Sequence, residues 1–196
     1  GNLVDGDYLI AICAKDMKDR GVLKKDAVVG TIMTNMGFNK FCEENGMKFI
    51  STKVGDRYVL EAMLKEGYNI GGEQSGHIIL LDYATTGDGQ LSGAMILSIM
   101  KRTGEKLSNL AKIMERMPQV LINVKVSAEG KLSFNTDEVI KAELNRITEI
   151  LGDRGRILIR VSGTEPLVRV MLEGDDYAEI EALANETAEI VKAKLG

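Results

Sequence analysis

The sequence is short of cysteine, histidine and long apolar runs, and each shortage excludes a class of protein. Its two cysteines, Cys13 and Cys42, are too few for a disulfide framework and lack the spacing of metal ligands. We expect both to be buried thiols in a reducing cytosol. No apolar run approaches the roughly 20 residues of a membrane span, and no basic-then-apolar signal pattern opens the chain. These absences predict a cytoplasmic protein with no membrane partner.

The chain also lacks an excess of positive charge. Its net charge of −4 gives no overall attraction to DNA, RNA or an anionic membrane. A phosphate group bound by such a protein must be held by a local site, so clustered arginines are informative. Apolar residues make up 44% of the 196 residues and charged residues 28%, which is typical of a folded globular protein rather than a disordered one.

Helix and strand signals alternate over residues 1–117 and predict an α/β domain. Asp7, Asp56 and Asp88 are each placed to cap a helix, and Gly67 and Gly104 to end one. The expected helices cover 8–20, 36–45, 57–66 and 90–103, and the expected strands cover 27–33, 47–52, 68–70 and 78–82.

The order of elements changes after Pro118, one of two prolines in the chain. Residues 118–196 are expected to form a second, small domain with a sheet on one side and helices on the other. The predicted strands cover 119–127, 156–162 and 167–173, and the predicted helices cover 137–151 and 176–195. The last helix carries one apolar stripe, which indicates packing against the sheet.

The stretch RVSGTEPLVRVM places two arginines around a small polar turn between strands. Hydroxyls, a glycine that admits close backbone approach, and forked guanidinium donors would together form a phosphate cradle. The alternative is a plain hairpin turn whose arginines balance Glu165 and Glu173. The candidate phosphate-binding residues are Arg160, Ser162, Gly163, Thr164 and Arg169.

The glycine-rich loop GGEQSGH at 71–77 carries groups suited to a sugar. Glu73 can accept from two vicinal hydroxyls, Ser75 can donate or accept, and His77, the single histidine of the chain, could exchange a proton near neutral pH. The alternative is that Glu73 and His77 satisfy backbone groups of the loop. In VGDRY, Arg57 lies unfavourably against the helix dipole, which hints at another partner, and Asp56 precedes it.

The stretches GGEQSGHIIL, TTGDGQLSGAMIL and RILIRVSGTEPLVRVMLEG resemble the third and fourth domains of the bacterial phosphoglucosamine mutases, a family of the α-D-phosphohexomutase superfamily. The likeness runs from Asp5 to the last residue. It implies a mixed-sheet α/β domain followed by a small α+β domain with a TATA-binding-protein-like sheet. It also implies an isomerase that interconverts glucosamine 6-phosphate and glucosamine 1-phosphate through a phosphoserine enzyme and a bisphosphate intermediate.

Three other interpretations stay open beside that one. The chain could belong to a phosphomannomutase/phosphoglucomutase of the same superfamily. It could be a non-catalytic phosphosugar-binding module, or a purely structural α/β protein in which Arg160 and Glu73 are dispensable for ligand binding. Its acidic charge argues against a nucleic-acid partner.

The resemblance also implies roles for single residues. Glu73 and Ser75 would read sugar hydroxyls, and His77 would assist proton transfer. Asp56 and Arg57 match a further substrate-facing loop. The clamp for the phosphate that is not being transferred would comprise Arg160, Ser162, Gly163 and Thr164, with Arg169 just after it.

Two motifs of the superfamily are not found in the sequence: the catalytic serine loop of the first domain and the three-aspartate magnesium loop of the second. We therefore expect the C-terminal half of an enzyme, with the end of the second domain at the extreme N-terminus and no metal site in this chain. Magnesium would be bound by the missing second domain, and the chain alone would be inactive. Its expected partners are a phosphosugar and the missing N-terminal domains, with a homodimer of the full-length enzyme left open.

Overall fold

The computed structural model describes residues 1–163 and 165–196, which fold as two compact units, Gly1–Arg116 and Met117–Gly196. Each unit has its own apolar core. In the part of the chain that the structure describes, no helix is both long and apolar enough to cross a membrane.

Unit 1 is built on a mixed four-stranded sheet. Its strands are β1 (Ala27–Thr31), β2 (Lys48–Thr52), β3 (Ile70–Gly72) and β4 (Ile78–Leu80), in the order β2-β1-β3-β4. β1 is parallel to both β2 and β3, and β4 returns antiparallel to β3 as a hairpin. The loops that follow β1, β2 and β3 therefore leave the same edge of the sheet, where α/β proteins commonly bind ligands.

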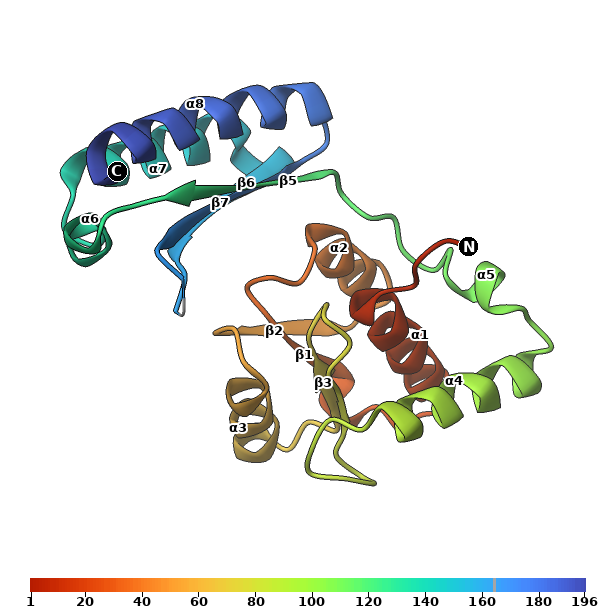
Figure 1. Cartoon of the computed structure of the whole chain (residues 1–196). Coiled ribbons are helices and arrows are strands. Elements are labelled where there is room, and N and C mark those ends of the chain that lie inside the picture. Colours follow the sequence, from red (N-terminus) through yellow and green to blue (C-terminus); the bar gives the residue numbers. More distant parts are fainter. Residues whose placement is uncertain (164) are drawn as a thin grey trace. The chain divides into compact units, whose positions relative to one another are not determined.

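Helices cover both faces of this sheet (Figure 1). The central strand β1 is buried along its whole length, with Val28 in the core of one face and Val29 in the core of the other. One face carries α1 (Gly6–Asp19), α2 (Met36–Glu44) and α4 (Gly89–Thr103), and the other carries α3 (Asp56–Glu66). A 3₁₀ turn, η1 (Lys24–Asp26), and the short α5 (Leu107–Leu110) complete the unit.

Two of the three predicted helix caps are wrong. The N-cap of α1 is Asp5, whose carboxylate accepts from the backbone N–H of Asp7 at 3.1 Å. Asp7 lies in the first turn and accepts from the N–H of Asn35 at 3.0 Å instead. The helix begins at Gly6, two residues earlier than predicted, so the first aspartate of the DGD stretch takes the cap position.

Gly55, not Asp56, is the N-cap of α3. Its φ of 128° is a backbone conformation that residues other than glycine rarely adopt. The third predicted cap is confirmed, since Asp88 accepts from the N–H groups of Gln90 and Leu91 at 2.9 and 3.0 Å. β3 begins at Ile70 rather than at residue 68 because the side chain of the buried Asn69 bonds the backbone of the turn near η1.

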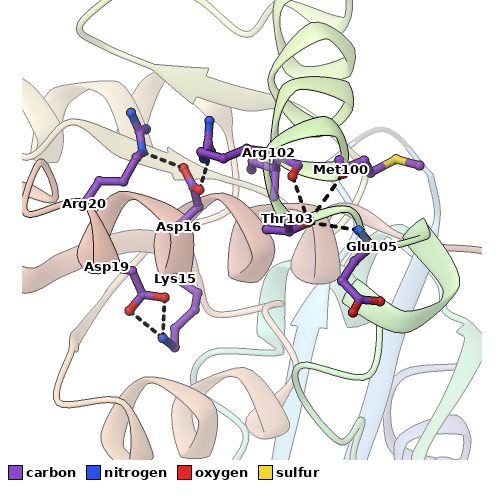
Figure 2. A network of polar contacts seen from close by, with 9 residues as sticks. Lys15, Asp16, Asp19, Arg20, Met100, Arg102, Thr103 and Glu105 are labelled. Atoms are coloured by element: carbon purple, nitrogen blue, oxygen red, sulfur yellow. Dashed lines mark hydrogen bonds and ion pairs between the residues drawn. The ribbon is translucent and has the colours of Figure 1, made fainter.

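Charged side chains join the C-terminal ends of α1 and α4 (Figure 2). Asp16 accepts from Arg20 on its own helix at 2.9 Å and from Arg102 on α4, while Lys15 pairs separately with Asp19. The side chain of Asp16 is only 9% exposed, so this two-arginine contact is partly shielded from water. It fixes α4, the helix that follows one of the candidate loops, against α1.

Unit 2 is an antiparallel three-stranded sheet with helices on one face (Figure 1). Its strands are β5 (Gln119–Lys125), β6 (Gly155–Val161) and β7 (Leu167–Gly174), in the order β5-β7-β6. α7 (Glu138–Leu151) and α8 (Tyr177–Leu195) pack on the sheet, and η2 (Gly152–Arg154) links α7 to β6. The predicted fold class, a mixed-sheet α/β domain followed by a small α+β domain, is confirmed.

One helix of unit 2 was not expected from the sequence. α6 (Ala128–Ser133) spans six residues, too few to show an apolar stripe, and contains Gly130. Ser127 starts it by accepting from the N–H of Gly130 at 3.0 Å. Gly130 is required because an added Cβ would lie 2.1 Å from the carbonyl oxygen of Leu195 at the end of α8.

Both cysteines are buried free thiols, as predicted. Burial is the main cause that raises the pKa of Cys13 and of Cys42 to about 12. Each thiol is therefore protonated at neutral pH and behaves as a small apolar side chain in the core of unit 1.

Candidate functional site

Three loops of unit 1 meet at one place: the segment between β2 and α3, the turn between β3 and β4, and the segment that leads into α4. Glu73 in the second loop accepts from the backbone N–H of Gly55 in the first, with 3.0 Å between Oε1 and N. Gly87 in the third loop packs against the ring of His77. The structure thus brings together three loops, of which the first and second are separated in the sequence by α3 and β3, and the second and third by β4.

The turn between β3 and β4 has a backbone held by its own hydrogen bonds. The N–H of Glu73 donates to the carbonyl of His77 at 3.0 Å, and the N–H of Gly76 donates to the carbonyl of Glu73 at 2.9 Å. Gly6, at the start of α1, donates to the carbonyl of Gln74 at 2.9 Å. The turn is therefore fixed by α1 from behind, while Ser75 at its tip is exposed.

His77 lies between Asp56 and Gly87. Its Nε2 atom is 3.5 Å from Oδ2 of Asp56, and an added Cβ at Gly87 would come within 2.4 Å of the same nitrogen. Nε2 is buried and has no hydrogen bond within the described residues. The side chain as a whole is 33% exposed, so another part of the ring reaches the surface.

The alternative interpretation is that the side chains of Glu73 and His77 only satisfy backbone groups of the loop. It holds in part for Glu73, but Nε2 of His77 bonds no backbone group within the described residues. The carboxylate of Glu73 does bond a backbone N–H, although one bond leaves most of its lone pairs available. Arg57 is engaged by its own helix, since its Nε donates to Oε1 of Glu61 at 2.7 Å and this bond raises the pKa of Arg57. Asp56 therefore joins Glu73 and His77, whereas Arg57 has a partner on α3.

In unit 2, the two candidate arginines are direct cross-strand neighbours. Arg160 on β6 pairs in register with Arg169 on β7, which pairs in turn with Asn123 on β5. Alternation along β7 turns Val168 and Val170 toward the helices, so these three side chains share the opposite face of the sheet. The register places three polar side chains in one row across the sheet.

Arg160 has no hydrogen-bond or ion-pair partner within the described residues. Desolvation by burial, followed by the positive charge of Arg169, lowers its pKa from the usual arginine range. Arg169 donates from Nη2 to Oε2 of Glu165 at 2.9 Å, and its buried Nε has no partner. Of the two adjacent guanidinium groups, only that of Arg169 therefore has a carboxylate partner within the described residues, which is the charge pattern of an anion site.

The small residues of the turn play different parts. Ser162 is buried, and its hydroxyl accepts from the N–H of Glu165 at 3.3 Å, which holds the turn. Gly163 is exposed. The predicted role of Thr164 lies outside the described residues.

Gly55, Gly87, Asn123 and Glu165 belong to these sites but were not among the candidates from sequence. The two glycines act through backbone and ring contacts that only the meeting of distant loops creates. Asn123 precedes Arg160 by 37 positions, and only the strand register brings it into the row. For Glu165, the sequence predicts only that its charge balances the arginines in the plain hairpin alternative.

Comparisons with known proteins match the whole chain. Residues 5–117 match the family described as phosphoglucomutase/phosphomannomutase, alpha/beta/alpha domain III, and residues 121–190 match its C-terminal domain. The phosphoglucosamine mutase of Caldanaerobacter subterraneus subsp. tengcongensis is 55% identical over 195 residues, which is 100% of this chain and 44% of that protein. The chain thus spans less than half the length of this curated relative.

Solved structures show the same fold. The N-acetylphosphoglucosamine mutase of Aspergillus fumigatus superimposes with a TM-score of 0.84 at 20% identity, over 98% of this chain and 44% of that one. A structure of the Aspergillus fumigatus enzyme in complex with GlcNAc-6P and magnesium gives a TM-score of 0.74 at 20% identity, over 100% of this chain and 45% of that one. The chain belongs to the phosphoglucomutase/phosphomannomutase family.

Proposed function

We propose that the chain is the substrate-binding part of a phosphoglucosamine mutase, which interconverts glucosamine 6-phosphate and glucosamine 1-phosphate. The observation that carries the proposal is the pairing of Arg160 with Arg169 on one sheet face, where Arg160 has no partner within the described residues. A site with excess positive charge binds the phosphate that stays on the sugar. The 55% identity to a phosphoglucosamine mutase supports the choice of amino sugar.

The loops of unit 1 carry groups suited to a sugar. Glu73 is fixed by Gly55 and keeps acceptor capacity for a hydroxyl or an ammonium group, and the exposed Ser75 can donate or accept. Asp56 adds a second carboxylate at this place. His77 is the candidate for proton transfer at the reacting oxygen.

Phosphoryl transfer needs positioning and charge neutralisation more than side-chain covalent chemistry, so residues that only bind and orient the substrate contribute to it. The transferable phosphoryl group would come from outside the described residues, in the remainder of a longer, cytoplasmic protein. Among the described residues, no group of three acidic, cysteine or histidine side chains could hold a metal ion. A magnesium ion would therefore need ligands from that remainder.

Turnover by the full-length enzyme tests the proposal. We expect Arg160→Gln to lower kcat/KM for glucosamine 6-phosphate by about 10- to 100-fold, the cost of one charge-assisted phosphate contact. Arg154→Gln is the matched control, because Arg154 pairs with Glu179 on the surface of the same unit. An equal loss in both variants, or none in Arg160→Gln, would contradict the assignment.

The choice of sugar is tested with the same enzyme. If Glu73 contacts the ammonium group, Glu73→Gln should lower kcat/KM for glucosamine 6-phosphate more than kcat/KM for glucose 6-phosphate. An enzyme that turns over glucose 6-phosphate or mannose 6-phosphate faster than the amino sugar would favour the phosphomannomutase/phosphoglucomutase interpretation.

A further inference from the structure

We infer that Asp56 is a positioning residue for His77: its carboxylate holds the buried Nε2 side of the imidazole, and Nδ1 is the nitrogen that exchanges a proton with substrate. The inference deepens the proposed function, since it names the atom through which His77 would act. It rests on the contacts of three loops in unit 1.

Nε2 is the ring nitrogen of His77 that faces inward. Nε2 is buried against Gly87, where there is no room even for a methyl group, so a sugar hydroxyl cannot reach that nitrogen. The ring nevertheless keeps 33% of its side-chain surface exposed. Proton exchange with a bound ligand must therefore use the other nitrogen, Nδ1.

The partner within reach of Nε2 is the carboxylate of Asp56. Oδ2 of Asp56 lies 3.5 Å away, while Oδ1 of the same carboxylate accepts from the N–H of Arg57 at 2.8 Å. That second bond turns Oδ2 toward the ring. A small rotation of the side chain, which is 61% exposed, closes the remaining distance to a hydrogen bond.

The other acids on these loops accept from backbone N–H groups instead. Glu73 uses Oε1 to accept from Gly55, and Asp88 uses Oδ1 to cap α4. Asp56 is the acid within ion-pair distance of His77 in the described part of the chain. Of the carboxylates on the three loops, Asp56 is the one placed to determine which ring nitrogen of His77 carries the proton.

A carboxylate on one imidazole nitrogen fixes the tautomer of the ring. With the proton of the neutral ring on Nε2, the lone pair of Nδ1 is free to take a proton from a sugar hydroxyl. As that hydroxyl oxygen bonds to phosphorus, the bond between phosphorus and the oxygen of the phosphoryl donor breaks. The resulting imidazolium keeps both protons. In the reverse direction, Nδ1 returns its proton to the sugar oxygen.

The single histidine makes a direct test practical, because every imidazole signal in a ¹⁵N NMR spectrum of this chain comes from His77. We expect Asp56→Asn to remove the preference of the neutral ring for a proton on Nε2, which the ¹⁵N chemical shifts of the two ring nitrogens report. Asp56→Glu, which restores a carboxylate, should recover most of that preference.

Glu61→Gln is the matched control, since it removes the same charge from the same helix but from a residue that pairs with Arg57. Its ring should keep the tautomer ratio of the unsubstituted chain. Equal changes of the tautomer ratio in the two variants, or none in Asp56→Asn with an intact amide spectrum, would overturn the inference.

These measurements need no ligand, so they separate the inference from the proposed function. If Asp56→Asn changes the imidazole as expected but glucosamine 6-phosphate leaves the spectrum unchanged, the pair exists and the proposed substrate is wrong. If the substrate shifts the loop while Asp56→Asn leaves His77 unaltered, the proposed function survives and the positioning role fails.

Discussion

Arg160 and Arg169 stand directly opposite each other on β6 and β7, two guanidinium groups in one cross-strand pair. Like charges in that position are destabilising unless an anion lies between them. On the same strand and the same face, Arg156 instead pairs with the fully buried Glu173 at 2.7 Å. Within the described residues, β6 therefore carries one arginine with a carboxylate partner and one without.

This contrast predicts stability changes of opposite sign. Arg160→Gln should raise the free energy of unfolding of unit 2 slightly, by up to about 0.5 kcal/mol, because it removes a like-charge contact. Arg156→Gln should lower it by about 3 kcal/mol, because Glu173 then loses its cationic partner on β6. Native-state hydrogen exchange of the β7 amides measures both. A loss of protection in Arg160→Gln would show that this arginine has a structural role.

Glu165 competes with phosphate for Arg169. Its carboxylate bonds Arg169 at 2.9 Å, and an incoming phosphate must displace it or share the guanidinium. Glu165→Gln should therefore tighten the binding of inorganic phosphate about threefold, which corresponds to the strength of one exposed ion pair. The control is Glu181→Gln, an exposed acid on α8 that bonds Tyr177. Weaker binding in Glu165→Gln would mean that Glu165 supports the site.

A buried acid makes the stability of unit 2 depend on pH. Glu143 accepts from Arg146 and from the buried Thr187, and the hydrogen bond from Arg146 is the main cause that lowers its pKa. A lowered pKa in the folded state adds stability above the unfolded value near 4.5, and that stability is lost as the pH falls through the folded value.

Glu143→Gln should accordingly destabilise unit 2 by about 1–2 kcal/mol at pH 7 and by less at pH 3. Hydrogen exchange of the α7 amides at the two pH values provides the measurement. The control is Glu138→Gln, whose side chain is 83% exposed and pairs with Lys141. Equal destabilisation by Glu143→Gln at both pH values would contradict the assignment of this acid.

The position of His77 depends on the absence of a side chain at Gly87. Gly87→Ala would place a methyl group 2.4 Å from the imidazole and force the ring to move. The His77 ring signals should then shift strongly, with a smaller change in backbone amides of the sheet. Gly89→Ala is the matched control, because no atom lies within 4 Å of an added Cβ there. If both variants leave the ring signals unchanged, the 85–89 segment does not hold His77.

The sequence is sufficient to predict the order of most elements, because this order depends on local signals, although the six-residue α6 carries too weak a signal. Apolar periodicity located β1 and α8, and the Ser-Gly-Thr turn located the arginines. The helix starts were harder, since the DGD stretch offers two aspartates and the chain uses Asp5.

Contacts between distant segments could not be predicted in the same way. The strand register that brings Asn123 beside Arg169 and the packing of Gly87 on His77 are products of the assembled sheet and loops. The bond between Glu73 and Gly55 is of the same kind, because no local pattern relates two loops separated by a helix and a strand.

An amide NMR titration of this chain with glucosamine 6-phosphate tests most directly whether the loops of unit 1 and the arginines of unit 2 bind a phosphosugar. With glucose 6-phosphate and inorganic phosphate as controls, we expect glucosamine 6-phosphate to shift amides in both 71–77 and 160–169. Inorganic phosphate should shift only the second segment. Amides that stay unshifted in both segments at about 10 mM ligand, well above the Kd expected for a phosphate held by two arginines, would contradict the proposed binding function.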